Sequence, residues 1–238
     1  MKIKLIANPK KKWAINLAAK VLSLLKKNKH KVVNNLADIT VCIGGDGTIL
    51  HANFDKTISG SVLAIGSDSS HMCQINKKNW KKDLLRFLRS KKRKRYPMLK
   101  IKSGKKTYCA VNDVVIHTHD YRVIEIMVLI RNSKNNYFSV PHKFEGDGII
   151  VSSSLGSTSY AYSAGGKIIV PATKKVMELV PICPYKRRFK PHIFDRYTDV
   201  LVSSDRTCDF IIDGILISRL KPRHSIHVSV EGEIEFVG

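Results

Sequence analysis

The chain has 238 residues, of which 43% are hydrophobic, and it carries a formal net charge of +23. This length and composition fit one large globular domain or two small ones, and they argue against a disordered chain, a membrane-spanning segment and a signal peptide. The five cysteines are scattered, odd in number and without a CxxC pair, which argues against a disulfide framework or a zinc ribbon and predicts a reducing cytoplasm.

The first part of the chain alternates strand patterns with helix patterns. The predicted strands are short apolar runs at residues 2–7, 38–43 and 61–66. The predicted helices have apolar residues at helical spacing or follow a glycine turn, and they are residues 14–25, a short helix starting near Gly47 or Thr48, and residues 77–90. Strand and helix in alternation predict a parallel, Rossmann-like α/β domain over residues 1–93.

From residue 94 onward the pattern changes to short β-type runs with a single helix expected near residues 156–164. The runs are residues 98–104, 107–119, 122–132, 137–146, 148–154, 198–204, 207–214, 224–230 and 232–238. Turn-forming residues separate them, among them residues 132–136 and Asp213-Gly214. This predicts a mainly antiparallel, β-sandwich-like domain over residues 94–238.

The basic residues cluster in three stretches, at residues 9–13, 77–96 and 185–190. Such clusters are typical of nucleic-acid binding, but they are equally typical of a solvated helix face or of attraction for anionic nucleotides. Aromatic residues are sparse around them, and no helix-turn-helix, KH or RNP pattern occurs. Nucleic acid is therefore not expected as a partner, although a non-enzymatic protein that binds nucleotides or nucleic acid stays an alternative.

The stretch Gly44-Gly45-Asp46-Gly47-Thr48 follows a buried strand. Glycines allow positive φ and close approach of the backbone to a ligand, and the N–H groups of a following helix suit phosphate oxygens. A carboxylate in such a place makes sense as the base that accepts a proton from an attacking hydroxyl, or as a group that handles a phosphate-bridging metal. The loop therefore indicates phosphoryl transfer with Asp46 as general base, and it is not a Walker A motif. A plain turn with Asp46 as helix N-cap stays open.

Two further stretches carry polar groups beside apolar strands. Residues 145–166 combine a Gly-Asp-Gly turn with many hydroxyls, which suit a polar ligand or, alternatively, cap a helix. Asn112-Asp113 lies inside an apolar run, where a ribose diol or a simple turn would satisfy the two side chains. His117 and His119 form an H-x-H pair without a third ligand, so no metal site is assigned.

Three motifs in this order, GGDGTIL, NDVVIH and GDGIIVSSSLGSTSYAYSAGGKIIVP, resemble the NAD kinase family. Residues 178–184 and Asp213-Gly214 follow in the family's order, so that the resemblance covers most of the chain. GGDGT alone is shared with diacylglycerol and sphingosine kinases, and a related kinase with another small-molecule or lipid acceptor is therefore an alternative. The hydroxyl-rich third motif favours a dinucleotide acceptor.

The resemblance implies transfer of a phosphate to the 2′-hydroxyl of the adenosine ribose of NAD, giving NADP. It implies ATP or polyphosphate as donor, Mg²⁺ or another divalent metal, a homo-oligomer such as a dimer or tetramer, and a site between an α/β domain and a β-sandwich-like domain. Asp46 matches the catalytic aspartate. The residues that match the family's phosphate-donor loop are Gly44, Gly45, Gly47 and Thr48. The NAD-binding positions match Gly47, Asn112, Asp113, Asp147, Thr158, Ser159, Tyr160, Ala161, Tyr162 and Ser163.

The chain departs from the family pattern in the loop after the third predicted strand. Family members usually have a sequence like GIN-x-G-x-x-GFL there, whereas residues 64–75 read AIGSDSSHMCQI. Gly66 replaces the asparagine, and Asp68 and His71 replace glycines. This loop normally helps to shape the dinucleotide site.

Overall fold

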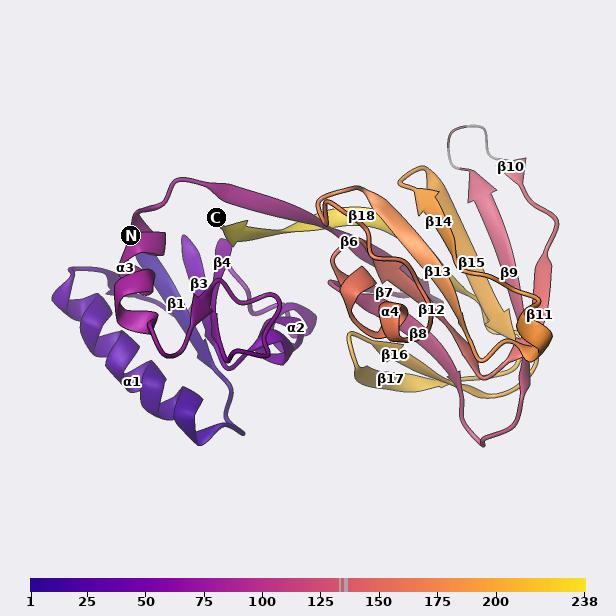
Figure 1. Cartoon of the computed structure of the whole chain (residues 1–238), viewed down its shortest axis with the longest axis horizontal. Coiled ribbons are helices and arrows are strands. Elements are labelled where there is room, and N and C mark those ends of the chain that lie inside the picture. The colour runs from indigo at the N-terminus through magenta and orange to yellow at the C-terminus, as the bar shows by residue number, and fades with distance from the viewer. Residues whose placement is uncertain (133, 135–136) are drawn as a thin grey trace. The chain divides into compact units, whose positions relative to one another are not determined.

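A computed structural model describes residues 1–132, 134 and 137–238, and the predicted turn at 132–136 lies partly outside this range. The chain divides into two compact units (Figure 1). Unit 1 comprises Met1–Arg95 and Ile234–Gly238, and unit 2 comprises Tyr96–Glu233. The last five residues of the chain thus belong to unit 1, although the sequence pattern groups them with the β-rich part.

Unit 1 is a parallel α/β sheet, as predicted. Its strands are β1 (Lys2–Ala7), β2 (Lys31–Val32), β3 (Ile39–Ile43), β4 (Ser61–Gly66) and β5 (Ile75–Asn76). Its helices are α1 (Lys12–Lys27), α2 (Asp46–Phe54) and α3 (Trp80–Arg89). The strand order is β2-β1-β3-β4, with every pair parallel, and the end of β18 (Ile226–Val237) joins β4 through Phe236 opposite Val62.

The core of unit 1 follows from the helical spacing of its apolar residues. Helix α1 buries Ala14, Leu17, Val21 and Leu25 along one face. These side chains pack in one cluster with β1, β3, β4 and two leucines of α3. Every residue of β3 and β4 is buried, as expected for parallel strands covered on both faces. This packing holds the carboxyl end of β3, and the glycine loop after it, in a fixed place.

Unit 2 contains two sheets, consistent with the predicted sandwich. Its strands are β6 (Arg93–Ser103, entering from unit 1), β7 (Lys106–Ala110), β8 (Asp113–Thr118), β9 (Ile124–Asn132), β10 (Tyr137–Phe138), β11 (His142–Gly146), β12 (Gly148–Ser153), β13 (Val176–Ile182), β14 (His192–Asp195), β15 (Thr198–Ser204), β16 (Cys208–Ile212), β17 (Ile215–Leu220) and most of β18. One sheet has the order β10-β9-β15-β18, with β11 beside β9 and β6–β7 beside β18. The other has the order β14-β13-β12-β8-β16-β17 and is antiparallel throughout.

Apolar side chains from both sheets form the core of unit 2, including Val114, Phe210 and Val228. The other face of the second sheet is covered by a 3-10 turn (Gly156–Thr158) and the short helix α4 (Tyr160–Ser163), which buries Ala161. This is the helix predicted near residues 156–164. A second 3-10 turn spans Tyr185–Arg187.

Three features of unit 2 differ from the sequence pattern. The run 107–119 is split, because the chain bends at Val111 and Asn112 between β7 and β8. Strands β13, β14 and β17 were not among the predicted runs, and β18 (Ile226–Val237) is one long strand where two runs, 224–230 and 232–238, were predicted. Within the described residues, no helix is both long enough and apolar enough to span a membrane.

Candidate active site

The glycine loop after β3 adopts a conformation that requires glycine. Gly44 and Gly45 have φ angles of 149° and 101°, and a Cβ on Gly44 would lie 2.5 Å from the Cβ of Asn8. Gly45 is the N-cap of α2, and Asp46 is the first helical residue, with no side-chain capping bond. The alternative of Asp46 as an N-cap is therefore wrong, and its carboxylate has another role.

The carboxylate of Asp46 is held by the loop after β4. It accepts hydrogen bonds from the backbone N–H groups of His71, at 2.8 Å, and Met72, at 3.0 Å. The thiol of Cys73 lies 3.6 Å from Asp46 Oδ1. Burial, followed by the nearby Asp46 charge, raises the pKa of this thiol to about 12, so that it stays protonated and donates at neutral pH. The loop that departs from the family pattern thus orients the predicted catalytic group.

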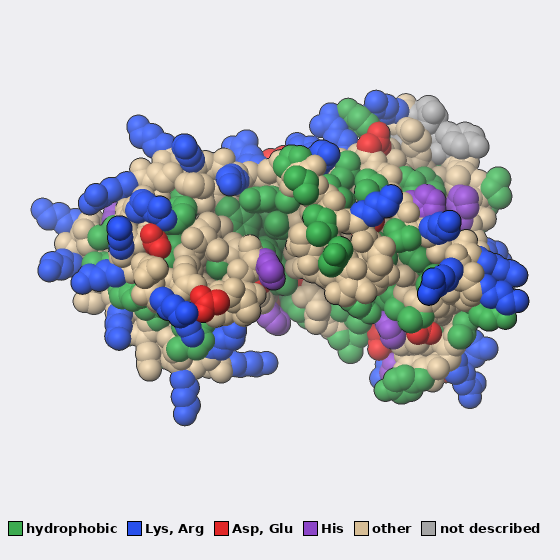
Figure 2. Space-filling view, in the orientation of Figure 1, with side chains coloured by type: hydrophobic (Ala, Val, Ile, Leu, Met, Phe, Trp, Pro, Cys, Tyr) green, Lys and Arg blue, Asp and Glu red, His purple; other side chains and the backbone are tan. Residues whose placement is uncertain are grey.

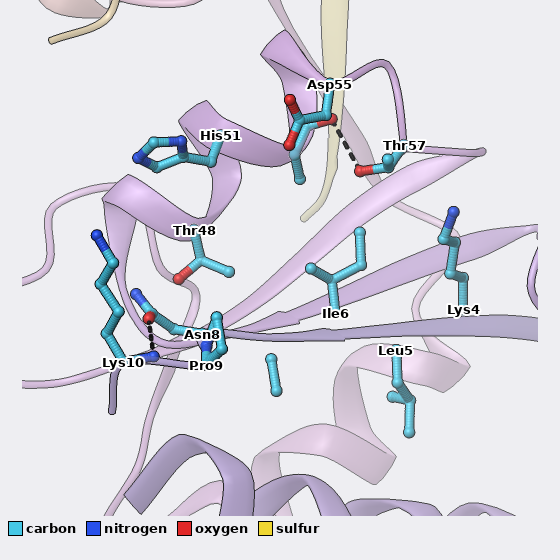
Figure 3. Close-up of a pocket in the computed structure, with 12 residues that line it drawn as sticks. Lys4, Leu5, Ile6, Asn8, Pro9, Lys10, Thr48, His51, Asp55 and Thr57 are labelled. Carbon is cyan, nitrogen blue, oxygen red and sulfur yellow. Dashed lines mark hydrogen bonds between the residues drawn. The ribbon is translucent and has the colours of Figure 1, made fainter. Parts of the chain in front are cut away.

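A cavity of about 570 Å³ lies between β1 and α2 in unit 1 (Figure 3). Thr48 and His51 of α2 line one side, and Asn8 and Lys10 line the other. Thr48 is 5% exposed, and its Oγ1 has no hydrogen-bond partner among the described residues. A buried hydroxyl without a partner costs free energy unless a ligand satisfies it. The cavity therefore suits a ligand with hydrogen-bonding groups near the first turn of α2.

Lys11 adds a positive charge at the glycine loop. Its Nζ donates a hydrogen bond to the carbonyl oxygen of Gly44 at 2.6 Å. Lys11 is the N-cap of α1, which begins with Lys12 and has neither a side-chain cap nor an acidic residue in its first turn. A positive charge at a helix N-terminus interacts unfavourably with the helix dipole. Such unfavourable local choices are expected at functional sites, and here an anionic ligand would offset the cost. The start of α1 and the start of α2 are thus both suited to phosphate.

The charge of the chain is concentrated in unit 1. This unit holds more than half of the Lys and Arg residues but fewer than a third of the Asp and Glu residues. Figure 2 shows Lys and Arg side chains far outnumbering carboxylates on the visible face. Such a surface raises the local concentration of polyanions such as nucleoside triphosphates.

In unit 2, the turn between β7 and β8 is built around Asp213. The Asp213 carboxylate accepts hydrogen bonds from three consecutive backbone N–H groups, those of Val111 at 2.8 Å, Asn112 at 2.7 Å and Asp113 at 3.1 Å. The N–H of Asp213 donates in return to the carbonyl of Asp113 at 3.0 Å. Successive N–H groups that converge on one anion form a nest. The predicted pair Asn112-Asp113 therefore lies in a turn fixed by a residue far along the chain.

Asp113 is a buried carboxyl beside another carboxyl. It is 5% exposed, and no donor in the described part of the chain hydrogen-bonds to its side chain. Burial, and then the charge of Asp213, raise the pKa of Asp113 to about 7. Burial also raises the pKa of Asp213, although its three N–H donors oppose this rise. Asp213 is thus the member of the pair whose carboxylate form is stabilised by N–H donors, and Asp113 is the one without such donors among the described residues.

The backbone of Asn112 is fixed by hydrogen bonds, whereas its side-chain oxygen Oδ1 has no partner among the described residues. Ser153 donates to the carbonyl of Asn112 through its N–H at 2.8 Å, and a Cβ on Gly156 would lie 2.2 Å from the same oxygen. The side-chain Nδ2 lies 3.5 Å from Ser159 Oγ, whereas the buried Oδ1 has no partner among the described residues. An amide oxygen in this state suits a hydroxyl or N–H donor of a ligand.

The remaining predicted residues of unit 2 are Asp147, which precedes β12, and residues 158–163, which include α4. Burial, followed by nearby negative charges that include Asp113 and Asp147, raises the pKa of the Tyr160 hydroxyl. Cys183 donates to the Asp147 carboxylate, and this bond raises the pKa of its thiol. Along α4, Tyr160 and Tyr162 are exposed, whereas Ala161 is buried in the core. Thr158 and Ser163 are exposed as well.

The family model described as ATP-NAD kinase C-terminal domain matches residues 111–236, which is more than half of the chain. The NAD kinase of Chloroherpeton thalassium is 30% identical over 218 residues, covering 86% of this chain and 74% of that protein. The chain belongs to the NAD kinase family. Its relatives in this family include the NAD kinase of Fusobacterium nucleatum, 29% identical over 98% of this chain and 90% of that protein.

Two solved structures share the fold. An NAD kinase from Archaeoglobus fulgidus in complex with ATP has a TM-score of 0.82 at 19% identity, covering 100% of this chain and 94% of that chain. Yeast NADH kinase complexed with NADH has the same TM-score and identity, covering 100% and 79%. Membership of the NAD kinase family, a family of phosphotransferases, leaves the lipid kinase and the nucleic-acid-binding alternatives without support.

The predicted site residues of this NAD kinase family member fall into two groups, one in each unit. Asp46 and the glycine loop lie together in unit 1. In unit 2, Asn112 lies beside Ser159 at the start of α4, whereas Asp147 lies beside Thr118 at the other end of the β8–β12 pair. Within residues 1–132, 134 and 137–238, no group of three or more His, Cys, Asp or Glu side chains is placed to bind a metal ion, so the H-x-H pair has no third ligand there. His119 instead lies 3.1 Å from Asp209.

Three contributors to the site were not predicted, namely Lys11, the N–H groups of residues 71–72, and the carboxylate of Asp213. The signal for Lys11 is present in the sequence, because three consecutive lysines open a helix that an acidic residue would stabilise better. Asp213-Gly214 was recognised as a turn, but the sequence carries no sign of the N–H groups that the carboxylate accepts.

Proposed function

We propose that this chain transfers the terminal phosphoryl group of ATP, or of polyphosphate, to the 2′-hydroxyl of the adenosine ribose of NAD, giving NADP. The observation that carries the proposal is the Asp46 carboxylate, held by two N–H donors at the start of α2 beside the glycine loop. With the Cys73 thiol, three of the four lone-pair positions of the carboxylate are occupied, and the fourth can still accept a proton from a hydroxyl.

The proposed chemistry uses Asp46 as general base. The O–H bond of the ribose 2′-hydroxyl breaks as its proton moves to Asp46, and the oxygen attacks the terminal phosphorus. A new O–P bond forms while the bond from that phosphorus to the bridging oxygen breaks, and ADP leaves with the electron pair. The N–H groups of His71 and Met72 keep the carboxylate in one orientation throughout, which lowers the entropy cost of reaching the transition state.

The donor phosphates are proposed to lie on the glycine loop. The backbone N–H groups of Gly45 and Gly47 and the free hydroxyl of Thr48 would bind phosphate oxygens, with Lys11 nearby as a counter-charge. The N–H of Gly44 is already used, because it donates to the carbonyl oxygen of Ile65 at 3.0 Å and so ties the loop to the end of β4. Because the described residues contain no cluster of three metal-binding side chains, a Mg²⁺ ion would be held largely by the phosphates, as is usual for this ion. The ion would neutralise phosphate charge during transfer.

The acceptor is proposed to bind to the group in unit 2. The free Oδ1 of Asn112 and the carboxyl of Asp113 suit ribose hydroxyls, and the exposed rings of Tyr160 and Tyr162 suit stacking on a base. Asp147, Thr158, Ser159 and Ser163 would add polar contacts, and Gly47 is proposed as a further NAD-binding residue. Ala161 supports this surface from the core. A homo-oligomer, dimer or tetramer, stays a prediction that light scattering of the purified protein would test.

The test is NADP formation by the purified protein with NAD, ATP and Mg²⁺, compared with Asp46→Asn. The asparagine keeps the shape of the side chain but cannot take the proton, so we expect the rate to fall by about a thousandfold or more. Circular dichroism and thermal unfolding of the variant serve as the control for folding. A wild-type protein that makes no NADP with either donor, and no NADPH from NADH, would refute the proposal.

A further inference from the structure

We propose that Asp213 is a positioning residue of the dinucleotide-binding group: its carboxylate holds the turn that presents Asn112 and Asp113 to NAD. The inference rests on the proposed function, because it concerns how the chain binds the proposed acceptor. It adds a residue to which neither the motifs nor the comparisons assign a role.

The contacts of Asp213 are reciprocal and specific. One oxygen accepts from Asn112 at 2.7 Å and Asp113 at 3.1 Å, and the other accepts from Val111 at 2.8 Å. With the returning bond from its own N–H to Asp113, Asp213 is tied to the turn by four hydrogen bonds. Hydrogen bonds to a charged acceptor are about twice as strong as neutral ones.

The hairpin between β16 and β17 delivers Asp213 to this place. Asp213 and Gly214 have φ angles of 50° and 77°, which is the conformation of a two-residue hairpin turn with an Asp-Gly sequence. Strand β16 pairs with β8 up to Ile212 opposite Val114. Asp213 is therefore the next residue along the pairing, directly beside Asp113. It is 8% exposed, so its contacts are shielded from water.

These contacts affect the two side chains that are proposed to bind NAD, Asn112 and Asp113. They bend the chain out of the strand at Val111 and Asn112, which places the Asn112 side chain with its Oδ1 free. They also put a second carboxylate beside the Asp113 carboxyl, which adds to the effect of burial in raising the pKa of Asp113. Burial, followed by nearby negative charges that include Asp113, raises the pKa of the Tyr160 hydroxyl, so this hydroxyl stays neutral in the same pH range.

The experiment measures NAD binding by titration calorimetry for wild type, Asp213→Asn and Asp213→Ala between about pH 6 and about pH 8. The asparagine can keep the bonds to Asn112 and Asp113 but presents its amide N–H₂ to the N–H of Val111. We expect the dissociation constant for NAD to rise about tenfold in this variant and further in the alanine variant, with the KM for ATP unchanged. The midpoint of the pH dependence of NAD binding should move down, because the charge beside Asp113 is gone.

The matched control is Asp209→Asn, in strand β16, which leads into the Asp213 turn. Asp209 pairs with His119 at 3.1 Å and Arg219 at 3.7 Å, so this change removes an ionic contact of unit 2 without touching the turn. We expect it to leave NAD affinity and the pH midpoint as in wild type. If Asp213→Ala does not fold, the asparagine variant decides.

A folded Asp213→Asn protein with wild-type NAD affinity and an unmoved pH midpoint would overturn the inference. Its failure is distinguishable from that of the proposed function. A wild type that binds NAD but makes no NADP refutes the kinase proposal and leaves the binding comparison intact, whereas a wild type that binds no NAD refutes both.

Discussion

The backbone N–H of His71 lies 2.8 Å from the carboxylate of Asp46, although 25 residues separate the two in the chain. The parallel pairing of β3 with β4 brings this about, because the loops that follow neighbouring parallel strands leave the sheet at the same edge. The loop after β4, in which Asp68 and His71 replace the glycines usual in the family, therefore supports Asp46 directly.

Gly66→Ala is predicted to lower kcat through this loop. A Cβ on Gly66 would lie 2.4 Å from Ser70 Oγ and 2.7 Å from Cys73 Sγ, so the loop has to shift and the bonds to Asp46 are disturbed. Because small misplacements of catalytic groups are costly, we expect kcat to fall by about a hundredfold. Steady-state kinetics of NADP formation below the unfolding temperature measures this effect.

Gly60→Ala is the control for loss of stability alone. Gly60 comes directly before β4, at the end of the strand away from the loop. A Cβ on Gly60 would lie 2.1 Å from the carbonyl oxygen of Asp38, so this change also strains unit 1. We expect it to lower the unfolding temperature while leaving kcat of the folded protein unchanged. Equal losses of kcat in the two variants would contradict a role for the loop in orienting Asp46.

Lys11→Gln is predicted to weaken donor binding. The change removes the charge that lies on the carbonyl of Gly44, and we expect the KM for ATP to rise about tenfold with the KM for NAD unchanged. The difference from wild type should shrink as ionic strength rises, because salt screens the interaction with phosphate. Lys20→Gln, an exposed position further along α1, should have no such effect, and an equal rise in both variants would argue against a specific role of Lys11.

Asp113→Asn is predicted to flatten the pH dependence of stability. The pKa of Asp113 is raised to about 7 in the folded state, against about 3.9 in an unfolded chain. Between these values the folded protein holds a proton that the unfolded chain has lost, so the free energy of unfolding falls as pH rises. The full loss from this group is about 4 kcal/mol, complete above pH ~7.

The asparagine cannot ionise and escapes this loss. The difference in free energy of unfolding between the variant and the wild type, measured by denaturant unfolding, should therefore depend on pH. From about pH 4 to about pH 8 it should change in favour of the variant. An unchanged difference between the two proteins across this range would mean that Asp113 is ionised in the folded protein at low pH.

Gly156→Ala is predicted to weaken NAD binding from the opposite side of the turn. Its Cβ would lie 2.2 Å from the carbonyl oxygen of Asn112, so Asn112 has to move, and we expect the dissociation constant for NAD to rise about tenfold. Gly104→Ala is the control: its φ of 57° strains any side chain, but no atom lies within 4 Å of its Cβ. It should lose about 1 kcal/mol of stability and keep its NAD affinity.

The sequence by itself determined the elements that depend on local chemistry. The helical spacing of Ala14 to Leu25 and the apolar runs of β3 and β4 predicted the parallel sheet of unit 1, because burial on one or both faces leaves a periodic pattern. The glycines before Asp46 predicted a turn into a helix at the end of β3, since few other residues adopt that backbone. The order of the motifs led to the NAD kinase family, which the comparisons confirmed.

Only the tertiary structure decided which distant groups meet. The bond from His71 to Asp46, the bond from Lys11 to Gly44 and the three bonds to Asp213 join residues between 25 and 102 positions apart. Such pairs depend on strand order and register, and no local pattern in a single sequence reveals them. The bend at Val111 and Asn112 is of the same kind: the run 107–119 has the apolar pattern of one strand, and the carboxylate of Asp213 divides it into two.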